Sequence, residues 1–156
     1  MQKHLNLKNK FLPFTITALL ASLDLFSKFL IRENNIQEYV VIDAILTIDL
    51  TYNTGIAFGL LSEYTIFTYI LSLIVFTWLV VQIKDIKEQN LELFSLVLIL
   101  SGAVGNLGER GWNLITGNDG KVTDFVELLF IPSFNLADSF ISIGIALLLY
   151  SEFKKN

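Results

Sequence analysis

The sequence predicts a mainly α-helical membrane protein with four transmembrane helices and a small extracytoplasmic β-sheet. Three observations support this fold class. Apolar residues gather in four stretches, each close to the roughly 20 residues that a helix needs to cross a bilayer. Basic residues gather on one side of the resulting topology, as the positive-inside rule describes. One segment between two of the stretches is rich in β-forming residues.

The clustering of the apolar residues defines the spans. The chain has 156 residues, of which 53% are hydrophobic, and soluble domains come close to this fraction. Its mean hydropathy is +0.60. The apolar stretches predict spans at residues 11–31, 64–83, 91–107 and 134–151, and the third of these is short. No linker, repeat or low-complexity tract divides the chain, so we expect one integral membrane domain over residues 1–156.

The first span resembles a signal peptide, because basic residues precede an apolar run. It is too long for the apolar core of a signal peptide, contains Asp24 and Lys28, and lacks a clear small-residue cleavage site. We therefore expect this span to be retained as a helix.

Basic residues predict the orientation of the spans. Seven of them lie before the first span, between the second and third, or after the fourth: Lys3, Lys8, Lys10, Lys84, Lys87, Lys154 and Lys155. Only Arg32, Arg110 and Lys121 lie on the other side. We therefore expect both termini in the cytoplasm and segments 32–63 and 108–133 outside. The net charge is −4 and no basic cluster typical of nucleic-acid binding is present, so we expect no such partner.

The two outward segments differ in composition. Residues 39–60 are rich in β-forming residues interrupted by acidic ones, which predicts short strands on the outer membrane surface. Asn53-Thr54-Gly55 indicates a tight turn, because asparagine and glycine tolerate a left-handed backbone. The second segment contains Gly117-Asn118-Asp119-Gly120, a turn cluster that we expect to form a mobile tip.

Several chemistries are disfavoured by what the chain lacks. It has no cysteine, which excludes disulfides, thiol nucleophiles and thiolate metal sites. The single histidine, His4, lies in the cytoplasmic tail, which argues against zinc sites and histidine-based triads. Ser101 and Ser139 lack an obvious base, although a Ser–Lys pair that uses Lys28 stays open. We expect neither a metal nor a cofactor.

Two pairs of polar residues within or just beyond the spans have helical i, i+4 spacing. Asp24 and Lys28 form either an interfacial ion pair, with the lysine reaching outward, or a polar stripe that faces a shared cavity. Asn106 and Arg110 follow a run of small residues that permits close helix packing. The arginine could reach the interface, or its planar fork could bind a peptide carbonyl or a lipid phosphate.

Asp124 and Asp138 are the strongest indication of function. An ionisable residue in or beside a span is costly, and it is therefore a candidate functional residue. Taken singly, Asp124 would be a solvated loop charge and Asp138 a carboxylate stabilised by a helix N-terminus. Together in a partly dry cleft they would share a proton. One could then accept a proton from water while the other donates a proton to a substrate carbonyl.

Five short motifs occur in order along nearly the whole chain. They are Asp24 with Lys28, Asn53-Thr54-Gly55-Ile56-Ala57-Phe58, Gly102-Ala103-Val104-Gly105-Asn106 with Arg110, Val122-Thr123-Asp124-Phe125, and Phe134-Asn135-Leu136-Ala137-Asp138. Any one of them would be a weak signal. In this order, on four spans, they resemble lipoprotein signal peptidase, also called signal peptidase II, an aspartic protease family of bacterial inner membranes.

This resemblance implies a function. The chain would be an aspartic endopeptidase of the cytoplasmic (inner) membrane that removes signal peptides from diacylglyceryl-modified prolipoproteins. It would cut just before the lipidated cysteine, at the extracytoplasmic face. The strand-rich segment resembles the family's sheet cradle. The implied partners are lipid-modified prolipoproteins and membrane lipids, and we expect a monomer.

The resemblance also implies residue roles. Asp124 and Asp138 would form the catalytic dyad. The residues that bind substrate or support the site would be Asp24, Lys28, Asn53, Gly55, Asn106, Glu109, Arg110, Asn135 and Ala137. Glu109 stands where the family usually has an aspartate, and the stretches before and after Asp124 are respectively longer and shorter than expected.

Two other function classes stay open from the sequence. A catalytically altered paralogue that binds lipidated peptides or lipids is suggested by Glu109 and by the altered loop lengths. A small ion- or proton-coupled transporter is suggested by carboxylates within spans. The clustering of the polar residues towards the outer side argues against a path across the membrane.

Overall fold

The computed structural model describes residues 8–55, 60–86 and 90–155. The predictions for Lys3, His4, Ile56, Ala57, Phe58 and Lys87 lie outside the described residues.

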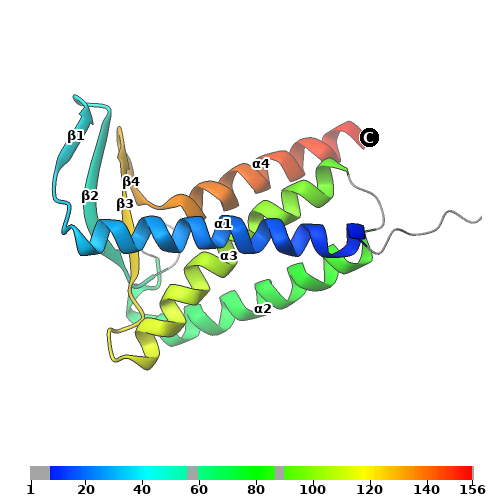
Figure 1. The fold of residues 1–156 in the computed structure, drawn as a ribbon, viewed down its shortest axis with the longest axis horizontal. Helices are drawn as coiled ribbons and strands as arrows, with labels where there is room; N and C mark the ends of the chain where they lie inside the picture. Colours follow the sequence, from blue (N-terminus) through cyan, green and yellow to red (C-terminus); the bar gives the residue numbers. More distant parts are fainter. Residues whose placement is uncertain (1–7, 56–59, 87–89, 156) are drawn as a thin grey trace, which may run out of the picture.

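Four long helices form a bundle, and a four-stranded sheet lies at one end of it (Figure 1). The helices are α1 (Lys8–Glu33), α2 (Thr65–Asp85), α3 (Leu91–Ile115) and α4 (Leu136–Lys155), and the short 3-10 helix η2 (Ser62–Tyr64) precedes α2. The strands are β1 (Tyr39–Ile42), β2 (Leu46–Asn53), β3 (Val122–Leu128) and β4 (Ile131–Phe134). All four long helices are long and apolar enough to cross a membrane. The predicted fold class is confirmed.

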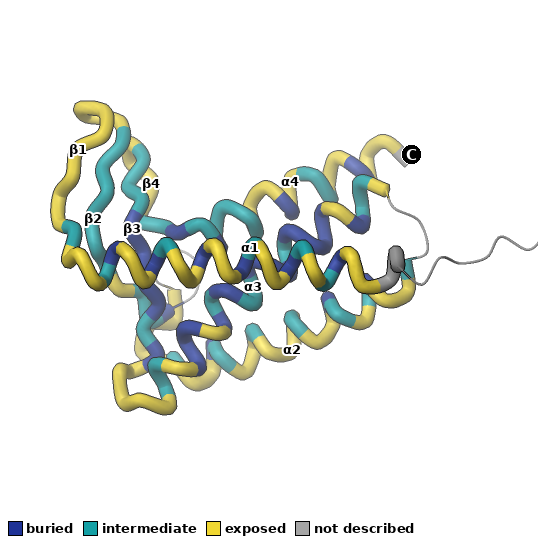
Figure 2. Tube along the Cα trace, in the orientation of Figure 1, coloured by how far each residue is buried: buried dark blue, intermediate teal, exposed yellow. Residues whose placement is uncertain are grey.

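The surface of α2 is that of a helix in lipid. Only Thr68, Leu79 and Ile83 of this helix are buried, while large apolar side chains such as Ile74 and Trp78 are exposed. A helix that is apolar all round must be covered, either by protein or by hydrocarbon. Figure 2 shows exposed positions along most of α2, so the bilayer is what covers them.

Helix α3 is the centre of the bundle and packs against the other three helices. Buried side chains of α2 and α3 form the apolar core, which consists of Leu79, Ile83, Leu93, Leu96, Val97 and Leu100. The helix continues to Ile115, beyond the expected end of the span at Leu107. Hydropathy falls at Asn106, Glu109 and Arg110, but their polar groups find partners inside the protein, so the helix does not stop there.

Small residues bring α3 and α4 into close contact. A Cβ atom on Gly102 would lie 2.2 Å from the Ala137 carbonyl oxygen and 2.6 Å from Ile141 Cγ1. On the facing helix α4, a Cβ on Gly144 would lie 2.8 Å from the Ser95 carbonyl oxygen of α3. Such contacts leave no room for a methyl group on either helix, so the glycines set the approach of the two backbones.

Segments 32–63 and 108–133, which the sequence predicts to lie outside, both contribute to the sheet, whose strands are antiparallel in the order β1-β2-β3-β4. Strands were predicted only in the first segment, and β3 and β4 come from residues after α3. The predicted turn at 117–120 joins α3 to β3, with Gly117 and Gly120 at φ of 78° and 62°. Pairing of β2 with β3 sets Asp124 opposite Thr51, where β3 passes the ends of the helices.

We predict that Gly102→Ala lowers the stability of the detergent-solubilised protein by about 1–3 kcal/mol, because the new methyl group would push α4 away. Thermal unfolding measures the effect. Gly108→Ala is the matched control, since its Cβ would lie 3.9 Å from its nearest neighbour, Leu25 Cδ1. Equal unfolding temperatures for the two variants would contradict the close contact of α3 and α4.

Candidate active site

The structure brings Asp124 and Asp138 together from different elements, β3 and the first turn of α4. Asn135, which is fully buried, stands between them. Its side-chain amide donates a hydrogen bond to Asp124 Oδ1 at 2.7 Å, and its side-chain oxygen accepts one from the Asp138 backbone N–H at 3.0 Å. A single asparagine therefore fixes both carboxyl-bearing residues relative to each other.

Asp138 and Asn135 also cap α4. The Asp138 carboxylate accepts a hydrogen bond from the Asn135 backbone N–H at 3.2 Å, which completes a reciprocal pair of the capping-box type. Asn106 Nδ2 donates to the other oxygen of Asp138 at 2.9 Å. The carboxylate that the sequence assigned to a helix N-terminus thus has a fixed orientation, and it remains half-buried at the edge of a cavity.

Asp124 is almost fully buried, with 3% of its surface exposed. Burial, and next the neighbouring charge of Asp138, raise the pKa of its carboxyl group to about 7. Hydrogen bonds from Asn53 and Asn135 and the charge of Lys28 oppose this rise in the pKa. Asp124 therefore holds a proton over a wide pH range and can donate it near neutral pH.

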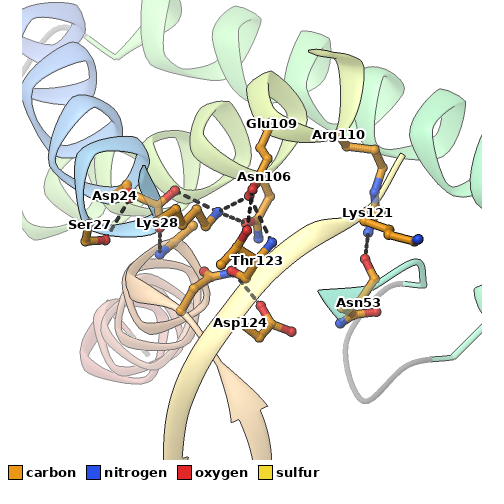
Figure 3. Close-up of polar contacts among 12 residues, drawn as sticks. Asp24, Ser27, Lys28, Asn53, Asn106, Glu109, Arg110, Lys121, Thr123 and Asp124 are labelled. Carbon is orange, nitrogen blue, oxygen red and sulfur yellow. Dashed lines mark hydrogen bonds and ion pairs between the residues drawn. The ribbon is translucent and has the colours of Figure 1, made fainter. Parts of the chain in front are cut away.

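A second group of charges lies behind the two aspartates, around Lys28, whose side chain is fully buried (Figure 3). Its ammonium nitrogen lies 2.7 Å from Asn106 Oδ1, 2.8 Å from Asp24 Oδ2 and 3.4 Å from Glu109 Oε2. Of the two interpretations left open by the sequence, the inward-facing polar stripe is the one observed. The lysine does not reach out to the interface.

Asp24 connects the first helix to the last. Its Oδ1 accepts a hydrogen bond from the backbone N–H of Ala137 at 2.8 Å, in the first turn of α4. Such N–H groups have no partner within their own helix. Gly105 makes the space for this carboxylate, because a Cβ there would lie 2.4 Å from Asp24 Oδ2.

Asn106 links the charges around Lys28 to the two aspartates. Its oxygen accepts hydrogen bonds from Lys28 Nζ at 2.7 Å and from Asn135 Nδ2 at 3.2 Å, while its amide donates to Asp138. The orientation of the amide is therefore fixed by donors on one side and an acceptor on the other.

Arg110 binds backbone carbonyls, one of the two partners that the sequence suggested for its guanidinium. Its donors contact the carbonyl oxygens of Gly55, of Asn53 at 3.4 Å and of Gly120 at 3.2 Å, and the Thr68 hydroxyl at 3.3 Å. Arg110 thereby holds the turn at Asn53 and Gly55, and the turn before β3, against the end of α3.

Two residues of this region were missed by the sequence analysis as site residues. Arg32 was considered only for its charge, although it follows Lys28 by four residues on the same helix face. Thr123 directly precedes Asp124, and its hydroxyl is fully buried beside Glu109. Both contact the carboxylate of Glu109.

A cavity of about 710 Å³ opens in front of Asp124 and Asp138. Polar residues line one part of it, namely Asn53, Asn106, Arg110, Asp124, Asn135 and Asp138. Apolar side chains of α2, α3, α4 and β4 line the rest, including Leu71, Val75, Leu79, Ile99, Phe134 and Ile141. Such a site accepts a molecule that has a polar group joined to hydrocarbon, with two carboxyl groups placed for acid–base chemistry.

Other sites considered from the sequence are not formed. Ser101 and Ser139 donate to the carbonyl oxygens of Val97 at 2.6 Å and Asn135 at 3.1 Å, and Lys28 is engaged by three other oxygens. A Ser–Lys pair is therefore not assembled. Within residues 8–55, 60–86 and 90–155, no group of three or more His, Cys, Asp or Glu side chains is placed to hold a metal ion.

Comparison with known proteins gives a consistent result. Residues 16–154 match the family model described as signal peptidase (SPase) II. The lipoprotein signal peptidase of Caldanaerobacter subterraneus subsp. tengcongensis is 34% identical over 142 residues, covering 89% of this chain and 94% of that protein. The lipoprotein signal peptidase of Pseudomonas aeruginosa is 34% identical over 154 residues, covering 90% and 87%.

The fold is also similar to a solved structure. A bacterial membrane enzyme determined by the in meso method at 2.3 Å resolution superposes with a TM-score of 0.81 at 26% sequence identity. The match covers 91% of this chain and 87% of that one, so the helices and the sheet are both shared.

We predict that Asp124→Asn raises the unfolding temperature more at about pH 7.5 than at about pH 4.5. The folded protein keeps this proton up to about pH 7, whereas an unfolded chain releases it near 3.8. The folded state thus binds more protons in this window, and stability falls as the pH rises through it. Asparagine does not titrate, so Asp124→Asn removes this fall of stability with rising pH.

Thermal unfolding in detergent at the two pH values measures the difference. Asp43→Asn is the matched control, because this exposed carboxyl group lies between β1 and β2, away from other charges of the site. If Asp124→Asn and Asp43→Asn change the unfolding temperature equally at both pH values, the burial of the Asp124 charge is contradicted.

Proposed function

Because the chain belongs to the signal peptidase II family, we propose that it is an aspartic endopeptidase whose catalytic dyad is Asp124 and Asp138. Membership makes the protein a multi-pass bacterial membrane protease that removes signal peptides from prolipoproteins. The single observation that best supports the dyad is the placement of both carboxyl groups on one cavity, joined through Asn135.

The proposed reaction uses one proton shared by the two carboxyl groups. Asp138 accepts a proton from a water molecule, whose oxygen attacks the carbonyl carbon of the scissile peptide. Asp124, the carboxyl group with the raised pKa, donates its proton to the carbonyl oxygen. As the tetrahedral intermediate collapses, Asp138 gives the proton it took from water to the amide nitrogen, the carbon–nitrogen bond breaks, and Asp124 takes back the hydroxyl proton as the carboxylic acid product forms.

The supporting residues keep the two carboxyl groups unequal. Asn106 and the Asn135 backbone donate hydrogen bonds to the Asp138 carboxylate, while Asp124 lies deeper, with 3% of its surface exposed. Two similar groups in different surroundings can take the roles of acid and base. We assign Asn106 and Asn135 to this orienting role, and Asp24, Lys28 and Ala137 to its support.

The apolar part of the cavity supports a lipid-modified substrate. Hydrocarbon from a diacylglyceryl group fits against side chains such as Val75, Ile99 and Ile141, within a part of the bundle surrounded by lipid. Binding of the lipid would hold the peptide bond just before the modified cysteine beside the dyad. We therefore propose cleavage at that bond.

We also propose that the sheet and the dyad face the extracytoplasmic side, with both termini in the cytoplasm. Lys84 and Lys154 lie at the ends of α2 and α4, opposite the sheet (Figure 1). Basic residues favour the cytoplasmic side of a membrane.

We predict that Asp124→Asn and Asp138→Asn each lower the rate of cleavage of a diacylglyceryl-modified prolipoprotein by about 10²- to 10⁴-fold, the usual contribution of a general acid or base. The assay follows release of the signal peptide by purified protein in mixed micelles, with the unlipidated precursor in parallel.

Asp43→Asn provides the control for the same chemical change at an exposed position. Wild-type rates in either dyad variant would overturn the catalytic assignment. Binding of the lipidated precursor by the unaltered chain without any cleavage would support the alternative of a binding paralogue.

A further inference from the structure

The carboxylate of Glu109 joins three elements of the fold. It is almost fully buried and has four hydrogen-bond or ion-pair donors, two from α1 and two from β3. Oε1 contacts the Arg32 guanidinium and accepts a hydrogen bond from the Thr123 hydroxyl at 2.6 Å. Oε2 accepts one from the Thr123 backbone N–H at 3.0 Å and lies 3.4 Å from Lys28 Nζ.

Arg32 contacts both partners of the hydrogen bond between Glu109 and Thr123. The guanidinium of Arg32 donates to the Thr123 hydroxyl at 3.1 Å as well as contacting Glu109. The three side chains therefore form a triangle in which the hydroxyl donates to a carboxylate and accepts from a cation. Hydrogen bonds to charged groups are stronger than those between neutral groups.

This triangle acts on the residue directly before Asp124. The Thr123 backbone N–H is held by Glu109, and its carbonyl oxygen accepts a hydrogen bond from Asn135 Nδ2 at 3.2 Å. On the far side, the Asp124 carbonyl accepts one from the Thr51 hydroxyl at 3.2 Å. The backbone at Asp124 is thus fixed by a residue of α3, a residue of β2 and Asn135, which directly precedes α4.

The charges of the cluster also require Arg32. Asp24 and Glu109 are two buried carboxylates, and Lys28 is the one fully buried cation between them. Lys28 balances one negative charge, and Arg32, whose side chain is 35% exposed, supplies the second positive charge from the edge. Without Arg32, the Lys28 ammonium would be the one cation among the described residues in direct contact with both carboxylates, which is costly in a buried site.

We propose that Arg32, Glu109 and Thr123 are positioning residues that hold Asp124 in its reactive orientation. The proposal rests on the assignment of Asp124 to the dyad. Because the three residues act on the backbone beside Asp124, they control the rate of the chemical step more than the binding of the substrate. A displacement of about 1 Å at a reacting group can cost about 100-fold in rate.

The first test replaces the hydroxyl without changing the shape of the side chain. Thr123→Val is expected to lower kcat for the diacylglyceryl-modified prolipoprotein by about 10- to 100-fold, while KM changes by less than about threefold. Thr123→Ser restores the hydroxyl and is expected to recover most of kcat. Thr17→Val is the matched control, because this buried hydroxyl has no hydrogen-bond partner among the described residues.

The second test removes the cation from the edge of the cluster. Arg32→Gln is expected to lower kcat by about tenfold with little change in KM. In the double variant with Thr123→Val, kcat is expected to fall little below that of Thr123→Val alone, since the two changes break the same triangle. The thermal unfolding of each variant in detergent is measured beside its kcat to show that the variant is folded. If Thr123→Val does not fold, the kcat of Arg32→Gln tests the proposal.

The outcomes separate the two proposals. Wild-type kcat in both Thr123→Val and Arg32→Gln, with an inactive Asp124→Asn, would overturn the positioning role and leave the dyad standing. A fully active Asp124→Asn would overturn the dyad itself. A loss of kcat in Thr123→Ser as large as that in Thr123→Val would also contradict the role of the hydroxyl.

Discussion

The arrangement depends on one constraint, which is that charges buried in an apolar bundle must be balanced and hydrogen-bonded. Lys28 and Arg32 together meet this constraint for Asp24 and Glu109, and Lys28 orients Asn106 as well. Asn106 in turn orients Asp138, and Asp24 holds the start of α4. The geometry of the site therefore follows from how one buried ammonium group is shared.

The sequence was sufficient for the helices and for most of the residues that the structure gathers around the cavity, because both depend on local signals. Spans follow from runs of apolar residues, and Asp24, Lys28 and Arg110 stand out as charges within or beside them. The same reasoning ended α3 too early. A polar residue in a span lowers hydropathy whether or not a partner exists, and the partners of Arg110 lie in segments far away in the chain.

The pairing of β2 with β3 could not be predicted, because it joins segments separated by two helices. The preference of single residues for strands says little about which strands meet. For the same reason the sequence did not indicate Thr123 or Arg32. A threonine in a short strand and an arginine at the end of a span are ordinary, and only their shared contact with Glu109 makes them part of this cluster.

The bond between Asp24 and the Ala137 backbone spans 113 positions of the chain and connects the first helix to the last. During synthesis α1 enters the bilayer before α4 has been made, so the Asp24 carboxylate at first lacks the Ala137 backbone N–H as its hydrogen-bond donor. The ion pair with Lys28 lies within the same helix and is available from the start, so the Asp24 and Lys28 side chains together add no net charge when α1 enters the bilayer. The growing chain therefore has no complete candidate active site until α4, which carries Asp138, has packed against the other helices.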